Sequence, residues 1–230
     1  MCYTIEINLT REQLEKRFKA TLDKHLPYRK QQRANAFSLP QCPVISTEDP
    51  GKIVLKTWGL IPSWVKDEQY ANAIRTKTFN AKAETLLEKP SFRHAVKSQK
   101  CLVLTNGFYE WQTRDKFKQP YYIGLRDDEA FALAGLFDNW INPQTGELFS
   151  TFTVITTAAN KMMEVIHNTK KRMPVILDPK EEELWIDPDM AVDKTLSFLK
   201  PFDERLMFAE EVDKALFRKS EKNNEEPTLF

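Results

Sequence analysis

The chain has 230 residues, of which 41% are hydrophobic and 29% charged, a composition typical of a folded globular protein and not of a disordered one. Its 34 basic and 33 acidic residues leave a formal net charge of +1, which excludes a strongly basic nucleic-acid-coating protein and an acidic tail protein. Apolar runs stop short of the ~18 residues that cross a bilayer, and Glu6 interrupts any signal peptide early. We therefore expect a cytoplasmic protein with no membrane partner.

The sequence offers no disulfide framework and no ready site for a metal or a nucleotide. Its three cysteines, Cys2, Cys42 and Cys101, are odd in number and far apart, so paired bridges are not expected. The chain has 3 His and no C-x-x-C pair, which argues against structural zinc. Its 6 Gly residues are scattered, whereas a phosphate-cradling or dinucleotide-binding loop needs clustered glycines. We predict neither a metal nor a cofactor.

The first predicted element is a half-buried strand over residues 2–8, where apolar side chains alternate with others. Cys2 falls on the face opposite Tyr3 and beside Glu6. We therefore expect the Cys2 thiol on the less buried face of this strand.

Capping residues and four-residue periodicity predict the helices, which follow Thr10 and span 81–89, 158–167 and 178–186. Asn80 is a good N-cap for the second of them, and Pro90 ends it. Short apolar runs predict strands over 52–58, 101–105, 121–125, 131–136, 151–156 and 173–177. Loops are predicted over 27–36, which is polar, and over 59–64, which exposes aromatic side chains.

Neither an internal repeat nor a break in composition divides the chain. We predict one α+β domain with a β-rich core over residues 1–215. Residues 216–230 are charged and poor in apolar groups, so they are predicted to form a disordered tail.

Cys2 is the most informative residue, because loss of Met1 would make it an N-terminal cysteine. Its amine and thiol would then lie on adjacent carbons with ordinary pKa values of about 8 and about 8.5, so both nucleophiles are partly available near neutrality. Such an aminothiol reacts with an aldehyde to form an imine, which the thiol attacks to close a five-membered thiazolidine ring. Proximity favours this intramolecular closure. The alternative interpretation is a small core cysteine.

Glu110 lies between two aromatic residues, Tyr109 and Trp111, and follows Phe108. Aromatic crowding desolvates a carboxylate and favours its neutral form, which raises its pKa. A glutamate with a raised pKa suits general acid and base catalysis near neutral pH. The alternative is an ordinary strand glutamate that points into solvent.

His167 falls near the end of a predicted helix, where the helix dipole would stabilise its charged form. It could transfer protons near pH 7, or it could simply cap the helix. Asn80 is ambiguous in the same way, because it is a good helix cap and its amide could also hold a substrate oxygen. His25 and His94 lie in polar stretches and are predicted to be surface residues.

Basic residues and tryptophans could together bind single-stranded nucleic acid, since bases stack on aromatic faces beside positive charge. The candidates are Arg75, Lys77, Lys82, Lys170, Lys171 and Arg172, with Trp58, Trp64 and Trp111. The alternative is a solvated surface above core tryptophans.

Five separated segments of the sequence are each weak evidence of function, but their combination is specific. They are Met1-Cys2, WGLIPSW at 58–64, FNAKAET at 79–85, GFYEW at 107–111, and a stretch from Thr156 through His167 to RMPVIL at 172–177. In order and residue type this set resembles the SRAP family, the SOS response-associated peptidases also called abasic-site processing proteins. The resemblance spans roughly residues 1–210.

The resemblance implies a mostly antiparallel, barrel-like β core flanked by short helices, with a cleft for single-stranded DNA. It also implies an enzyme of DNA repair that forms a thiazolidine crosslink with abasic sites through Cys2 after Met1 is removed. Activity as a lyase and reversal of the crosslink are implied as well. Its partner would be single-stranded DNA that contains abasic sites, bound by a monomer that joins the nucleoid on damaged DNA.

Matching by motif assigns roles to single residues. Cys2 would be the nucleophile, Asn80 would position the sugar or the amine, Glu110 would assist ring opening and imine chemistry, and His167 would transfer protons. The implied DNA contacts are Lys82, Arg75, Trp64, Trp111, Thr156 and Arg172. The chain departs from the family in having Tyr3-Thr4 where Gly-Arg is common, and Lys82 where an arginine would hold phosphate with two parallel bonds.

Two other functions remain open from the sequence. The family's older name suggests a thiol peptidase or autopeptidase, in which Cys2 attacks a carbonyl with help from Glu110 and His167. A non-covalent module for single strands would instead show salt-sensitive affinity without Cys2. The near-zero net charge favours modest non-covalent affinity, and therefore a covalent step to secure the complex.

Overall fold

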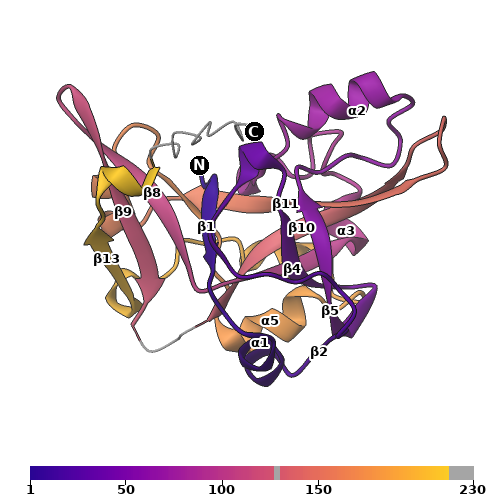
Figure 1. The fold of residues 1–230 in the computed structure, drawn as a ribbon, viewed down its shortest axis with the longest axis horizontal. Coiled ribbons are helices and arrows are strands. Elements are labelled where there is room, and N and C mark those ends of the chain that lie inside the picture. The colour runs from indigo at the N-terminus through magenta and orange to yellow at the C-terminus, as the bar shows by residue number, and fades with distance from the viewer. Residues whose placement is uncertain (127–129, 218–230) are drawn as a thin grey trace, which may run out of the picture.

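The computed structural model describes residues 1–126 and 130–217. Within them lies one α+β domain whose centre is a closed barrel of five strands (Figure 1). The barrel strands are β4 (Gln41–Ser46), β5 (Asp49–Trp58), β7 (Lys100–Thr105), β10 (Phe131–Ile141) and β11 (Leu148–Ala158). Four of the five pairings are antiparallel, and the parallel pairing of β11 with β5 closes the ring. The predicted fold class and barrel-like core are confirmed.

Three short strands extend the barrel at its edges. They are β2 (Thr21–Leu22), parallel to β5, and β6 (Asn80–Lys82) and β12 (Arg172–Pro174), which pair parallel and antiparallel with β11. The pairing with β11 puts Asn80 beside Val154 and Lys82 beside Thr156. Two of the segments that resemble the SRAP family therefore meet on one barrel strand.

A second sheet of five antiparallel strands carries the N-terminus. Its order is β13 (Met207–Glu211), β9 (Phe117–Leu125), β8 (Gly107–Arg114), β1 (Thr4–Ile7) and β3 (Gln31–Asn35). The register sets Ile5 opposite Phe108 and Thr4 opposite Tyr109. Continuing that register brings Glu110 alongside the first residues of the chain.

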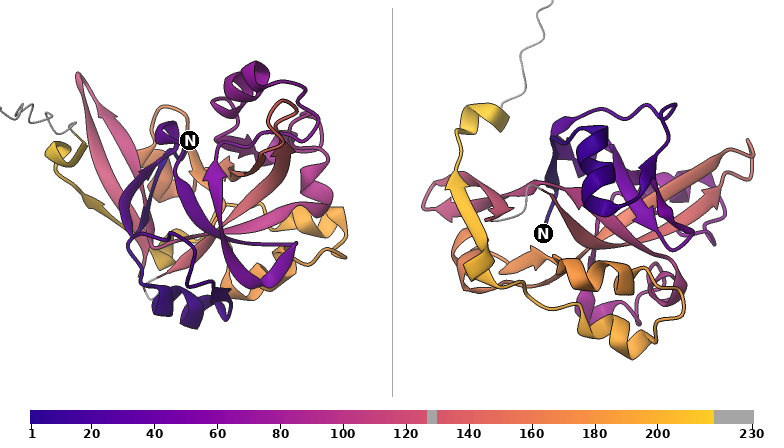
Figure 2. Two further views of the ribbon diagram at one scale, coloured as in Figure 1. Left: turned by 45° about the vertical axis from the view of Figure 1, so that its right-hand side comes forward. Right: turned by 90° about the horizontal axis from the view of Figure 1, so that it is seen from below.

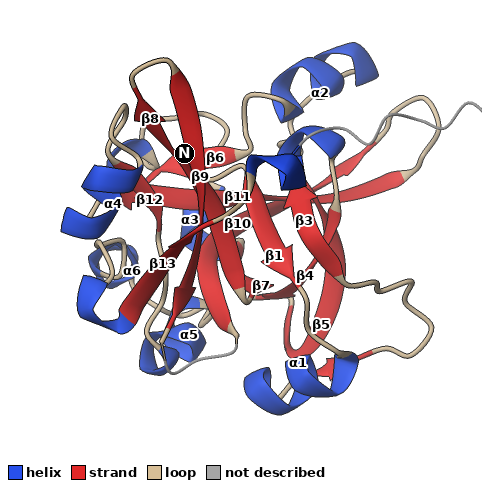
Figure 3. Ribbon diagram, turned by 60° about the vertical axis from the view of Figure 1, so that its left-hand side comes forward, coloured by secondary structure: helices blue, strands red, loops and turns tan. Residues whose placement is uncertain are grey.

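The helices are short and lie around the strands (Figure 3). They are α1 (Arg11–Phe18), α2 (Glu68–Arg75), α3 (Ala95–Ser98), α4 (Lys161–Ile166), α5 (Pro179–Trp185) and α6 (Val192–Ser197). The cap predicted at Thr10 is confirmed as a capping box, and α5 begins with Pro179 after the capping residue Asp178. Helices α1 and α5 cover one end of the molecule, while the N-terminus and α2 lie at the opposite end (Figures 1 and 2). Four 3₁₀ turns span Ala36–Ser38, Ala83–Thr85, Glu204–Leu206 and Lys214–Phe217.

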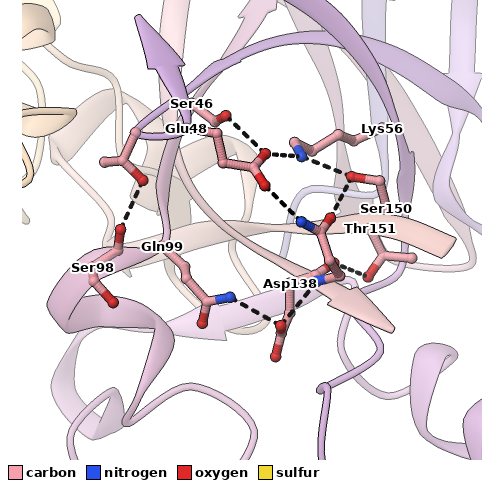
Figure 4. A network of polar contacts seen from close by, with 10 residues as sticks. Ser46, Glu48, Lys56, Ser98, Gln99, Asp138, Ser150 and Thr151 are labelled. Carbon is pink, nitrogen blue, oxygen red and sulfur yellow. Dashed lines mark hydrogen bonds and ion pairs between the residues drawn. The ribbon is translucent and has the colours of Figure 1, made fainter. Parts of the chain in front are cut away.

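A polar network joins the barrel strands near one end (Figure 4). The buried ammonium of Lys56 donates to Glu48 and to the hydroxyl of Ser150, both at 2.7 Å, and lies 4.2 Å from the ring centroid of Phe137. Asp138 accepts the backbone N–H of Ser63 at 2.8 Å. Because buried polar groups need such partners, the network fixes the 59–64 loop, which carries Trp64, against the barrel.

Two predicted elements are wrong, and both errors arise from pairing partners distant in sequence. Residues 27–36 were expected to be a loop, yet 31–35 form the edge strand β3, whose polar side chains suit an exposed edge. The helix predicted over 81–89 is instead strand β6 followed by a 3₁₀ turn. Pairing with β11 satisfies the backbone of Asn80–Lys82, which outweighs the local helix signal.

The remaining predictions agree in type and differ in length. The predicted strands at 121–125, 131–136 and 151–156 are the inner parts of β9, β10 and β11, and α4 is shorter than the predicted 158–167. The predicted tail begins with Leu216 and Phe217 in a 3₁₀ turn, and its other residues, 218–230, lie outside the described residues.

We predict that Gly135→Ala destabilises the barrel. A Cβ at Gly135 would lie 2.9 Å from the carbonyl oxygen of Thr153 and from the sulfur of Cys101, and the barrel backbone cannot easily move away. Overpacking of this kind costs about 1–3 kcal/mol of unfolding free energy, measurable by urea denaturation. Gly51→Ala in β5 is the control, because its Cβ would meet only Asp49 at 3.5 Å. Equal stability of the two variants would contradict the prediction.

Candidate active site at the N-terminus

Cys2 is fully buried, so the prediction of a thiol on a less covered face is wrong. Strand β1 lies between β8 and β3 and is covered on both faces, with Thr4 and Ile5 each at most 1% exposed. Burial, and secondarily the charge of Glu110, raise the pKa of the Cys2 thiol, which is therefore protonated at neutral pH. The thiol belongs to the hydrophobic core cluster that also contains Ile5, Phe108 and Val154.

The amine of Met1 lies at the centre of the site. It is 3.1 Å from Nε2 of His167 and 3.4 Å from Oε1 of Glu110. The side-chain amide of Asn80 donates to the carbonyl oxygen of Cys2 at 2.8 Å. Three of the side chains predicted to be catalytic, those of Asn80, Glu110 and His167, therefore converge on the first two residues of the chain, although they come from β6, β8 and the end of α4.

Glu110 is 3% exposed, which rules out the alternative of a solvent-facing strand residue. Burial raises its pKa to about 7, and the nearby N-terminal amine partly opposes the shift. The predicted rise in pKa is confirmed. A carboxyl group with this pKa can donate and accept protons near neutrality.

His167 is the C-cap residue of α4 and is also buried. Burial lowers its pKa, with the N-terminal amine and Lys170 acting in the same direction, so the predicted stabilisation of its charged form is wrong. Its Nδ1 donates to the carbonyl oxygen of Arg172 at 2.7 Å, so Nε2 is the nitrogen without a proton in the neutral ring. The amine lies 3.1 Å from Nε2 and 3.2 Å from Nδ1. His167 is therefore both a helix cap and a neutral base beside the N-terminus. His25 and His94 are exposed, as predicted.

A cavity of about 340 Å³ opens onto this amine. Its lining residues are Met1, Tyr3, Glu110, Trp111, Thr113, Lys118, His167, Thr169 and Lys170. Lys118 and Lys170 bring positive charge to it. Sequence reasoning missed Tyr3, whose only signal was its place next to Cys2, and Lys118, a lysine in the hairpin that follows the GFYEW segment.

The residues predicted to contact DNA differ in how exposed they are. Trp111 lines the cavity, Lys82 is exposed, and Trp64 is 43% exposed beside Tyr70. Arg75 is half-buried, and burial lowers the pKa of its guanidinium.

Thr156 and Arg172 are already engaged within the protein. Thr156 is fully buried, and its hydroxyl donates to the carbonyl oxygen of Ala81 at 3.3 Å. The guanidinium of Arg172 forms two bonds with Glu84, at 2.8 and 2.9 Å, and one with the carbonyl oxygen of Thr156 at 2.6 Å. In this arrangement they brace β6 and β12 against β11.

Neither a metal cluster nor a membrane-spanning helix is found in the two described ranges. No group of three or more His, Cys, Asp or Glu side chains there could hold a metal ion. No helix in the same ranges is long and apolar enough to cross a membrane.

The fold and site define a protein whose candidate reactive centre is its own N-terminus, set between a β barrel and a second sheet. Residues 1–218 match the SRAP family, the SOS response associated peptidases, and the chain belongs to this family. The abasic site processing protein YoqW of Bacillus subtilis (strain 168) is 44% identical over 169 residues, which are 73% of this chain and 71% of that protein.

Similarity extends to a vertebrate protein and to a solved structure. The abasic site processing protein HMCES of Gallus gallus is 38% identical over 150 residues, covering 56% of this chain and 44% of that protein. The crystal structure of a Bacteroides thetaiotaomicron protein has a TM-score of 0.91 at 36% identity and covers 95% of both chains. The predicted family resemblance is confirmed.

We predict that Glu110→Gln changes how stability depends on pH. The pKa of Glu110 is raised on folding from 4.5 to about 7, so its contribution to stability is present below pH 4.5 and is lost as pH rises through 7. Relative to the glutamine variant, the wild type should lose on the order of 3 kcal/mol between pH 4 and pH 8. Urea denaturation of both proteins at several pH values measures this difference. A difference that stays constant with pH would contradict the shifted pKa.

Proposed function

We propose that this chain processes abasic sites in single-stranded DNA by forming a covalent thiazolidine with Cys2 after Met1 is removed. The observation that carries the proposal is the position of the Met1 amine between Glu110 and His167. Cleavage after Met1 moves the free amine to Cys2, the adjacent residue, and so creates an aminothiol beside both groups. The names of the relatives, abasic site processing proteins, point to the same substrate.

Two unpaired hydrogen-bond acceptors at the site are consistent with the binding of a ligand that carries hydrogen-bond donors. Oδ1 of Asn80 and Oε1 of Glu110 are buried and have no hydrogen-bond partner, apart from the 3.4 Å ion pair of Glu110 with the amine. Buried polar atoms are seldom left in this state. The released Cys2 amine or the hydroxyls of an opened sugar could satisfy both oxygens.

The proposed reaction joins the aminothiol to the aldehyde of the ring-opened sugar with loss of one water. Neutral His167 accepts a proton from the ammonium form of the Cys2 amine, which then attacks the aldehyde carbon and forms a C–N bond. The former carbonyl oxygen gains a proton as the nitrogen loses one, which gives a carbinolamine. Protonated Glu110 donates to its hydroxyl, so water leaves and a protonated imine forms. The Cys2 sulfur then adds to the imine carbon while the thiol proton passes to Glu110, and the five-membered ring closes.

The imine intermediate also allows strand scission and reversal. Removal of a proton from the carbon next to the imine expels the 3′ phosphate by β-elimination, which is a lyase reaction. We propose that His167 or ionised Glu110 accepts that proton. In reversal, the C–S bond breaks as protonated Glu110 gives its proton to the sulfur, which restores the protonated imine. Water then adds to the imine carbon with ionised Glu110 as the base, and departure of the Cys2 amine would regenerate the aldehyde.

The geometry favours this reaction over peptide cleavage by the thiol. An autopeptidase would need to polarise the carbonyl of Met1, whereas the amide of Asn80 donates to the carbonyl of Cys2. Burial also raises the pKa of the Cys2 thiol and keeps it protonated, whereas a thiol peptidase attacks with the thiolate.

We predict that Cys2→Ala abolishes a covalent product with abasic single-stranded DNA. The experiment incubates protein lacking Met1 with the DNA and separates the products on a denaturing gel, with the N-terminus checked by mass spectrometry. Cys42→Ala is the matched control, because Cys42 is equally buried but lies in β4, away from the site. A covalent band that survives loss of Cys2, or its absence in the wild type, would contradict the proposal.

We predict that Glu110→Gln slows crosslinking by about 100-fold and removes its dependence on pH near 7. General acid and base catalysis contributes about 10²–10⁴-fold, and the pKa of Glu110 is about 7. The wild-type rate of imine formation should fall as pH rises through 7, because the acid form of Glu110 is lost. Single-turnover rates between pH 5.5 and 8.5 measure this. An identical pH profile in both proteins would remove Glu110 from the proton transfers.

A further inference from the structure

An aromatic cluster adjoins the site and takes no part in the chemistry proposed above. The rings of Tyr3 and Phe37 lie 5.2 Å apart between centroids, and Phe79 contacts both edge-on at 6.3 and 5.2 Å. Phe79 is buried, Tyr3 is half-buried, and Phe37 is 66% exposed. Phe37 has the largest exposed fraction of any large apolar side chain in the described residues.

A single exposed apolar residue needs no explanation, but Phe37 is held in place by a well-bonded turn. Oδ1 of Asn35 accepts the backbone N–H of Phe37 at 2.9 Å, and the hydroxyl of Ser38 donates to the carbonyl oxygen of Asn35 at 2.7 Å. Leu39 closes the turn in the left-handed region, with φ of 52°. The ring is therefore presented to solvent by a fixed backbone, supported from below by Phe79.

Tyr3 and Phe79, the two rings that pack against Phe37, are each adjacent in sequence to a residue of the candidate site. Tyr3 follows Cys2 and lines the cavity with Glu110 and His167. Phe79 precedes Asn80, whose amide holds the carbonyl of Cys2. Adjacent Cα atoms are about 3.8 Å apart, so the cluster lies within the reach of a nucleotide next to one bound at Cys2.

We propose that Tyr3 and Phe37 form a stacking platform for an unpaired base that flanks the abasic nucleotide. An abasic sugar offers no base for the protein to hold, so affinity must come from its neighbours and their phosphates. Aromatic faces bind bases of any sequence, which suits an enzyme that must act wherever a base has been lost.

The platform rests on the proposed function, so its test uses DNA that cannot react. The probe is a single strand carrying a tetrahydrofuran abasic analogue, and its affinity is measured by fluorescence anisotropy. Phe37→Leu should weaken binding on the order of 10-fold, because the aliphatic side chain keeps apolar bulk but loses the aromatic face. Phe37→Trp should bind at least as tightly as the wild type. Phe18→Leu, on α1 at the opposite end of the molecule, should leave affinity unchanged.

A second set of strands, each lacking one further base on the 5′ or 3′ side of the analogue, completes the test. Loss of the base that occupies the platform should weaken binding to the wild type by the same factor as Phe37→Leu. The variant should then lose nothing more on that strand. Unchanged affinity in Phe37→Leu, or equal losses on every strand, would overturn the platform.

Further measurements distinguish failure of the platform from failure of the proposed function. With a natural abasic site at saturating DNA, Phe37→Leu should reach the same final yield of crosslink as the wild type. If the wild type gives no crosslink, the proposed function fails while the analogue measurements still decide the platform. If sedimentation shows a wild-type dimer that Phe37→Leu dissociates, the exposed ring is covered by a second copy of the chain and the platform is overturned.

Discussion

The placement of the chain's N-terminus against two buried titratable groups is the constraint on which the rest of the site depends. A terminal amine is normally left in water, yet here it lies against a buried carboxyl group and a buried imidazole. Placing it there requires β1 to be an inner strand, hydrogen-bonded to β8 on one side and to β3 on the other. Because both edges of β1 are paired, the first two residues are directed into the site.

Desolvation at the site shifts the pKa values of Glu110 and His167 in opposite directions. Burial raises the pKa of Glu110 to about 7 and lowers the pKa of His167, so near neutral pH Glu110 is partly protonated and His167 is largely neutral. One of them then holds a proton that it can give, and the other has a lone pair that can take one. Two titratable groups whose pKa values are shifted apart by their environments are suited to paired acid and base roles. The carbonyl of Arg172, which accepts from Nδ1, fixes the orientation of the imidazole.

The barrel supplies the other half of the site. Strand β11 pairs with β5, β6 and β12, and so brings Asn80 and the segment after His167 to the same region. Thr156 and Arg172 stabilise that junction through bonds to Ala81 and Glu84. Their buried contacts explain why they contribute to the site by supporting β6 and β12, while exposed aromatic rings remain available for a ligand.

Local patterns by themselves determined the barrel strands β5, β7, β10 and β11, the capped helices α1 and α5, the crowded environment of Glu110 and the segments that mark the family. These features depend on neighbours within a few residues, which is why a sequence reveals them. The strand at 31–35, the replacement of a helix by β6, the full burial of Cys2 and the neutral state of His167 were decided only by the tertiary structure. Each depends on partners distant in the chain, whose pairing and desolvation outweigh local preference.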